Sequence, residues 1–166
     1  MTPLKVIQTL PLAWQGDARA GEDPAWGDEA LRLLDIAHSL QQRRHLAEEP
    51  APLDVEIQRL HDKLDLVLEC MARLLPAELP LRRQAVELAV EALAWNERVE
   101  AGPGWVHLQL HPALPQPLRL PGQAQPVEAG VRVLLEPTRW PPPLQQAWHQ
   151  QVFLQHRRAL ARRRGS

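Results

Sequence analysis

The feature that most constrains the fold of this 166-residue chain is an apolar repeat between residues 53 and 74. Its members follow one another at alternating spacings of four and three residues: Leu53, Ile57, Leu60, Leu64, Val67, Met71 and Leu74. An apolar period of about 3.5 residues keeps one seam of a helix facing a partner helix, as in coiled coils. Leu68 and Leu75 widen the stripe beyond that seam. The pattern predicts a helix with more apolar surface than one neighbouring helix covers.

Two interpretations of this stripe remain open. In the first, it packs on a preceding helix and on the body of the same chain. In the second, it is the surface through which copies of the chain self-associate, with a tetrameric bundle as one arrangement. We predict the second, a homo-oligomer.

A preceding amphipathic helix is predicted from Asp28, as its N-cap, to about Ala47, because Pro50 and Pro52 prevent its continuation. The mixed apolar and β-branched residues 4–14 predict a short strand, and the Gly/Pro-punctuated stretch 16–27 predicts a linker. Whether that strand joins the following part of the chain stays open.

After Pro80 the pattern changes to short alternating apolar runs at 86–88, 106–110, 118–120 and 131–135. Turn-forming residues separate them at 101–104, 112–117, 121–122 and Gly130, which predicts an antiparallel barrel or sandwich. A closing amphipathic helix is predicted from about Leu144, with Trp148 and Phe153 holding it to the β-structure.

The chain is therefore predicted to be an α+β protein in three parts. Residues 1–27 form a strand and linker, residues 28–76 a helical oligomerisation segment, and residues 77–166 a small antiparallel β-barrel with its C-terminal helix.

Five segments, taken in their order, resemble the PilZ family of bacterial cyclic di-GMP receptor domains. They are RLHDKLDLVLECMARLLP (59–76), VELAVEALAW (86–95), GWVHLQLHP (104–112), LPQPLRLPGQA (114–124) and VFLQHRRALARR (152–163). The similarity is greatest to atypical members that carry a helical oligomerisation segment. It implies a PilZ-like barrel and a role in cyclic di-GMP-linked motility, pilus or biofilm control.

In that family, nucleotide-binding members have an arginine pair spaced RxxxR and a [D/N]xSxxG motif. Here the second motif aligns with Glu87, Ala89 and Ala92, so its serine and glycine are missing, while Arg82 and Arg83 are adjacent. Guanidinium groups grip phosphates bidentately, and an altered spacing changes what they reach. The resemblance thus predicts a degraded site without nucleotide binding in the usual mode; a functional cyclic di-GMP receptor using Arg82, Arg83 and Glu87 is the alternative.

Enzymatic and metal-dependent classes find no support in the residues. Cys70 is the only cysteine, and neither His107 with His111 nor His38 with His45 has the further ligands that a zinc site needs. No serine lies in a nucleophile elbow, and no glycine-rich phosphate loop is present. We therefore predict a non-enzymatic module without a cofactor or metal.

The net charge is −1, which gives no general affinity for nucleic acid. The arginine-rich end, with Arg157, Arg158 and residues 162–164, leaves a nucleic-acid-binding adaptor as a second alternative. With one cysteine and no membrane-spanning stretch, the chain is predicted to be cytoplasmic and to act on an unidentified protein partner.

Overall fold

The computed structural model describes residues 5–42, 52–74, 79–114 and 116–164. Their elements, in chain order, are β1 (Lys5–Gly16), α1 (Ala25–Gln42), α2 (Pro52–Leu74), β2 (Arg82–Ala89), β3 (Ala92–Trp95), β4 (Gly102–Leu108), β5 (Leu118–Val127), β6 (Gly130–Leu134), the 3-10 turn η2 (Pro137–Arg139) and α3 (Pro142–Arg164). The α+β class predicted from the sequence is confirmed.

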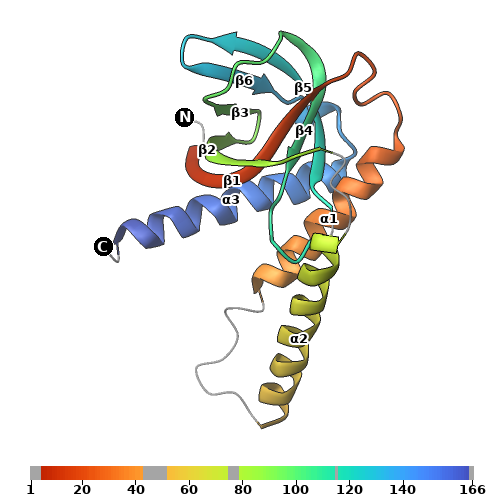
Figure 1. The fold of residues 1–166 in the computed structure, drawn as a ribbon, viewed down its shortest axis with the longest axis vertical. Coiled ribbons are helices and arrows are strands. Elements are labelled where there is room, and N and C mark those ends of the chain that lie inside the picture. The colour runs from red at the N-terminus through yellow and green to blue at the C-terminus, as the bar shows by residue number, and fades with distance from the viewer. Residues whose placement is uncertain (1–4, 43–51, 75–78, 115, 165–166) are drawn as a thin grey trace.

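The six strands form a closed antiparallel barrel in the order β1-β2-β3-β6-β5-β4 (Figure 1). β1 closes it, because Leu12 is paired with Arg82 on one side and with Leu108 on the other. The strand near the N-terminus, whose place the sequence left open, is thus a barrel strand. The residues that precede the helical segment and those that follow it therefore build one sheet. The division of the chain into three parts stays a prediction from the sequence.

The interior of the barrel is filled by alternate residues of its strands, as the period of two requires. These inward side chains are fully buried: Leu12, Val86, Leu88, Leu93, Val106, Leu108, Leu118, Leu120, Val131 and Val133. The alternation predicted after Pro80 is therefore confirmed, and the strand β3, which was not predicted, supplies Leu93.

Two segments predicted as turns, 101–104 and 121–122, lie largely within β4 and β5 instead. Gly104 and Gly122 serve close packing between strands. A β-carbon at Gly104 would clash with the backbone oxygen of Gln15, and one at Gly122 would lie 2.5 Å from Cγ1 of Val133. A turn motif read from local sequence cannot reveal such a contact.

Helix α1 begins at Ala25, not at Asp28. The Asp23 carboxylate accepts a hydrogen bond of 2.9 Å from the Ala25 backbone N–H, so the capping role predicted for Asp28 belongs to Asp23. The predicted linker therefore contains the first turn of the helix. The last residues predicted for this helix, 43–47, lie outside the described part of the chain.

Helices α1 and α3 pack on each other and on the barrel (Figure 1). Trp148 of α3 is fully buried and donates its indole N–H to the carbonyl of Val90 over 2.9 Å. Its predicted role in holding the helix is confirmed. Phe153 is half exposed, so the same role predicted for it was wrong.

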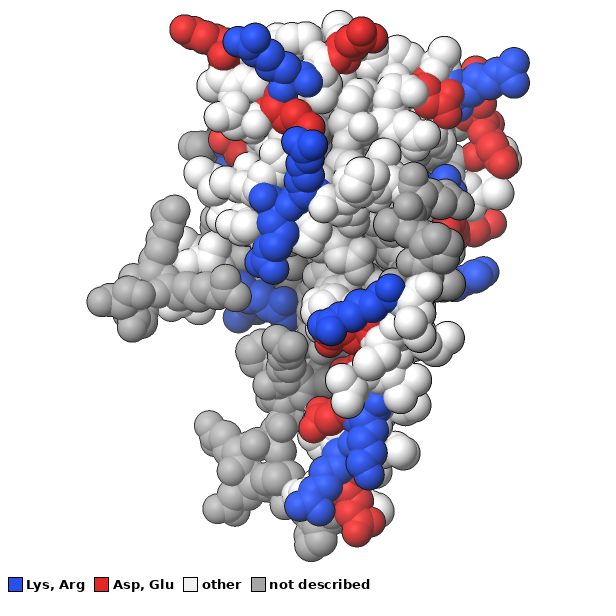
Figure 2. Space-filling view, viewed as in Figure 1, with Lys and Arg blue, Asp and Glu red and all other residues white. Residues whose placement is uncertain are grey.

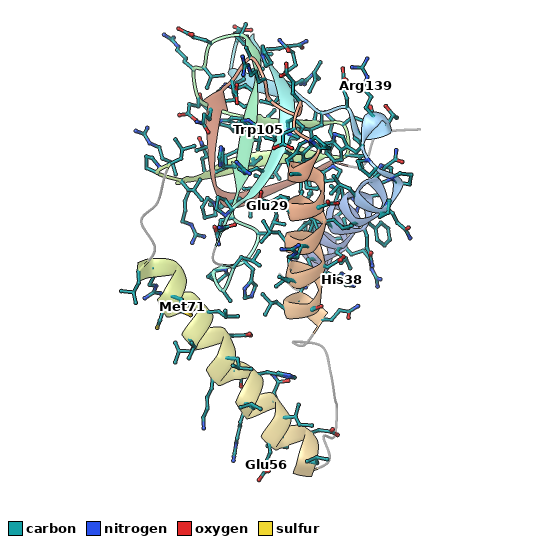
Figure 3. All side chains as sticks on the ribbon, turned by 90° about the vertical axis from the view of Figure 1, so that its right-hand side faces the viewer. Glu29, His38, Glu56, Met71, Trp105 and Arg139 are labelled. Atoms are coloured by element: carbon teal, nitrogen blue, oxygen red, sulfur yellow. The ribbon has the colours of Figure 1, made fainter. Side chains whose placement is uncertain are left out.

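Helix α2 projects away from the barrel (Figures 1 and 3). Of the apolar side chains of α2 that the structure describes, only Leu68 packs against the main hydrophobic core. Within the described residues, the structure holds no helix whose length and apolar character would suffice to span a bilayer.

Candidate functional site

The exposed seam of α2 is the most prominent unpartnered surface of the described residues. Its seven residues are Leu53, Ile57, Leu60, Leu64, Val67, Met71 and Leu74, and between 43% and 84% of each is exposed. We call these seven residues the seam. Large exposed apolar patches on a folded protein mark interaction sites.

The seam is flanked by charged residues of both signs, and Figure 2 shows blue and red side chains interspersed with white along the projecting helix. Two intrahelical pairs, Arg73 with Glu69 and Gln58 with Asp62, fix part of its polar surface. Of the two residues predicted to widen the stripe, Leu68 turns toward the core and Leu75 lies outside the described residues.

The positions assigned to the degraded nucleotide motif do not meet in one place. Arg82 and Arg83 are exposed at the start of β2, opposite Leu12 and Pro11. Ala89 lies at the end of that strand, six and seven residues on, which at about 3.3 Å per residue puts it roughly 20–23 Å from the two arginines. The two arginines are also adjacent on a strand, so their side chains point to opposite faces of the sheet.

At the other end of the motif, Glu87 forms an ion pair of 2.7 Å with Lys5 across β1 and β2. Ala89 is buried, and half-buried Ala92 is paired with Leu134 in β6. The carboxylate thus already has a cationic partner, and methyl groups occupy the positions of the missing serine and glycine.

A cluster that the sequence did not predict joins the barrel to the helices. Arg119 on β5 lies over the indole of Trp105, 5.5 Å from its centroid, and forms an ion pair of 2.7 Å with Glu29 of α1. Trp105 and Glu29 lie on neighbouring elements in Figure 3. The indole of Trp26 packs edge-on against Trp105, with their centroids 6.0 Å apart.

The tryptophan contacts continue from Trp26 to Trp140 and from Trp140 to Trp148. This series runs from the barrel wall through the start of α1 to α3. Such edge-to-face pairs are favourable beyond the area they bury. The six tryptophans were visible in the sequence, but their pairing depends on how separate elements pack.

A cleft of about 480 Å³ lies at the end of β1 and the start of β4, with Trp14, Asp17, Glu100 and Pro103 in its lining. Asp17 accepts hydrogen bonds from the backbone N–H of Arg19 and from the indole N–H of Trp105. These two bonds, in that order of effect, lower the pKa of Asp17. The cleft therefore carries a carboxylate held in its charged form.

The described residues contain no group of three or more side chains suited to holding a metal ion. His107 bonds to Gln15, and the Nδ1 of His111 accepts the N–H of Ala113. Cys70 is exposed on α2. At the C-terminal end, Arg157 lies 6.0 Å from the centroid of the Phe153 ring, while the side chains at 162–164 are outside the description.

Comparison with known proteins gives a family match and a structural match. A family model described as "Atypical PilZ domain, cyclic di-GMP receptor" matches residues 31–165. A solved structure from Xanthomonas campestris, described as a tetrameric PilZ domain self-assembled via a helical bundle, is similar with a TM-score of 0.69 and 27% identity. The similarity covers 96% of this chain and 92% of that one. Comparison with curated proteins gives no match.

Proposed function

This chain belongs to the atypical PilZ domain family, and from that premise we propose that it is a non-enzymatic regulatory scaffold. Copies of it assemble through the seam of α2, and the assembly presents several barrels to a protein partner. The family model that matches describes a receptor domain, and it does not describe an enzyme.

The observation that carries this proposal is the exposed seam. Seven large apolar side chains at coiled-coil spacing are left uncovered by the rest of the described residues. Burying an aliphatic side chain stabilises an association by about 1.5–3 kcal/mol when the burial is complete. Assembly supplies that burial, and a heptad spacing directs it to helix–helix packing. The tetrameric helical bundle of the similar structure supports the same mode here.

Assembly would change how a barrel binds its partner. Several barrels on one bundle raise the effective concentration of each after the first has bound, so weak single contacts give a firm combined attachment. The partner is a protein that remains to be identified.

Nucleotide binding in the usual mode is not part of the proposal. The arginines lie roughly 20–23 Å along β2 from Ala89, and Glu87 is paired with Lys5. A bidentate grip on a phosphate with simultaneous contact to the base needs these groups to converge. By analogy with its family, the chain would act in bacterial cyclic di-GMP-linked motility, pilus or biofilm control, in the cytoplasm.

One sample tests the proposal in two measurements. Light scattering on the purified chain should give a mass of several chains, against 18.8 kDa for one. Isothermal titration calorimetry on the same sample, with cyclic di-GMP as the probe, should give no heat of binding. A monomeric mass across the concentration range would overturn the scaffold.

A functional receptor is the second candidate, favoured by the family model's own description as a cyclic di-GMP receptor. Binding at micromolar concentration or tighter would establish it. The variant Arg82→Ala/Arg83→Ala should then abolish the heat, while Arg139→Ala, an exposed arginine on η2 far along the chain, should leave it unchanged.

A further inference from the structure

The cleft of about 480 Å³ between the end of β1 and the start of β4 has an aromatic ring in its wall. Trp14 of β1 is paired with Val106 and follows Leu12 on the interior face of the sheet. A β-carbon at Gly104 would lie 2.5 Å from Cζ2 of this indole, so the ring lies directly over the glycine. Trp14 is half-buried and packs against the core, which fixes the ring while part of it lines the cleft.

Two carboxylates, Asp17 and Glu100, line the same cleft. Asp17 accepts one hydrogen bond on each oxygen, from the Arg19 backbone N–H at 2.9 Å and from the Trp105 indole N–H at 3.0 Å. An ionised carboxylate has about four acceptor positions, so about two of them remain for a ligand. The same two bonds lower the pKa of Asp17, which keeps it charged at neutral pH.

Glycines keep the entrance of the cleft open on both strands. A β-carbon at Gly16 or at Gly102 would meet no heavy atom within 4 Å. Asp17 and Glu100 are the only charged residues in the lining, and both are acidic. The nearest cations in the sequence, Arg19 and Arg98, are exposed and are not part of the lining. The cleft is therefore open to a cationic side chain that enters from solvent.

We propose that this cleft receives an arginine side chain of the protein partner. The proposal rests on the proposed function, which leaves the chemistry of the partner open, and it assigns that partner a basic contact segment. A guanidinium is planar, so it can stack on the face of an indole and can also donate in a fork to a carboxylate. Its aliphatic stem packs on apolar lining such as Val99 and Pro103. One arginine thus matches both the aromatic and the acidic part of the lining.

The position of the cleft leaves the seam of α2 free. Trp105, which holds Asp17, lies in the barrel and apart from α2 (Figure 3). Exposed ion pairs are weak singly, so one barrel holds one arginine only weakly. An assembly offers one such cleft on each barrel, and several clefts together hold a partner with repeated arginines more firmly.

Fluorine NMR of the full-length chain labelled with 5-fluorotryptophan tests the contact. The six tryptophans give six signals, and the variant Trp14→Phe identifies the signal of Trp14. The probe is the peptide acetyl-Gly-Arg-Gly-amide. The control probe carries citrulline in place of arginine, which keeps the shape of the side chain and removes its charge. We expect a saturable shift of the Trp14 signal with the arginine peptide and none with the citrulline peptide. The signal of Trp148, which is fully buried, should not move with either.

Two variants locate the binding in the cleft. Glu100→Gln should raise the peptide concentration at half-saturation by about threefold, because one exposed charge is lost. Glu91→Gln, in the exposed β2–β3 turn near the opposite end of β1, should leave it unchanged. Gly16 has no positive φ, so Gly16→Leu can fill the cleft without backbone strain. That variant should abolish the shift, while unchanged signals from the five other tryptophans show that the fold is kept.

Three results would each overturn the arginine site. They are the absence of a saturable Trp14 shift, an equal shift with the citrulline peptide, and the same half-saturation in Glu100→Gln as in the wild type. Tighter binding of acetyl-Gly-Lys-Gly-amide would overturn the choice of arginine. Light scattering on the same sample separates this proposal from the scaffold. A mass of several chains without the shift removes only the arginine site, whereas a monomeric mass with the shift removes only the scaffold.

Discussion

The indole N–H of Trp105 donates a 3.0 Å hydrogen bond to Oδ2 of Asp17, which ties the segment after β1 to the outer face of β4. The backbone N–H of Arg19 binds the other carboxylate oxygen over 2.9 Å. Both bonds favour the ionised carboxylate, and so the pKa of Asp17 lies below its ordinary value of 3.8.

This lowered pKa predicts the sign of a pH effect. A carboxyl with a lower pKa in the folded state stabilises the fold above its unfolded pKa and loses that contribution as pH falls through the folded pKa. Asp17→Asn should therefore be less stable than the wild type at pH 7, and the difference should shrink below about pH 4. Urea unfolding at a series of pH values measures this difference in the free energy of unfolding. Glu128→Gln, in the exposed β5–β6 turn, is measured in parallel as a control substitution.

The proposed assembly interface predicts different results for two leucines of α2. Leu60 lies in the seam and Leu66 outside it, and they are exposed to a similar extent, 57% and 61%. Leu60→Asp/Met71→Asp should reduce the mass to that of one chain, because an unpaired charge buried in an interface costs several kcal/mol. Leu66→Asp should keep the mass of the wild type. If both dissociated, the effect would be one of helix stability and not of the seam.

The packing of α3 predicts a contrast between two aromatic residues. Trp148→Ala should lower the free energy of unfolding by about 3–5 kcal/mol, because it empties a fully buried site and leaves the Val90 carbonyl without its donor. Phe153→Ala, half exposed on the same helix, should cost less than about 1 kcal/mol. Chemical denaturation at a fixed protein concentration measures the free energy of unfolding of each variant. A loss of equal size would mean that Phe153 holds the helix after all.

Removing the chain from Arg157 onward should leave the number of chains in the assembly unchanged, because the seam lies on α2. The side chain of Arg158 approaches the carbonyl of Gln41 at 3.4 Å, so only a small loss of stability is expected. Light scattering checks the mass. Salt-dependent binding of the intact chain to a mixed-sequence duplex, lost on truncation, would instead favour the nucleic-acid adaptor.

Local periodicity was enough to predict much of this fold. The alternation at 106–110 and 131–135 specifies which side chains face the barrel interior, and the seam spacing specifies a helix from Leu53 to Leu74. These patterns succeed because burial selects one face of an element, and that face recurs at the period of the element.

The errors arose where distant parts of the chain set the local structure. Gly104 and Gly122 resemble turn glycines, yet neighbouring strands approach them too closely for any side chain. Asp17 and Trp105 are 88 positions apart, so no local pattern joins them. The nucleotide-motif residues failed to converge for the same reason, since their grouping came from a family pattern and their placement comes from the register of β2.

The place of β1 also has a consequence for how the chain folds. Leu12 must pair with Arg82, about 70 residues later, and with Leu108 later still, before the barrel is closed. The backbone hydrogen bonds of helices α1 and α2 are local, and both helices lie between these partners in the chain. Long-range strand pairing is slower, because the intervening loop must first close. During synthesis from the N-terminus, α2 is therefore complete before the barrel can close around its core. In the assembly proposed above, copies made close together would meet through α2 while each barrel is still open.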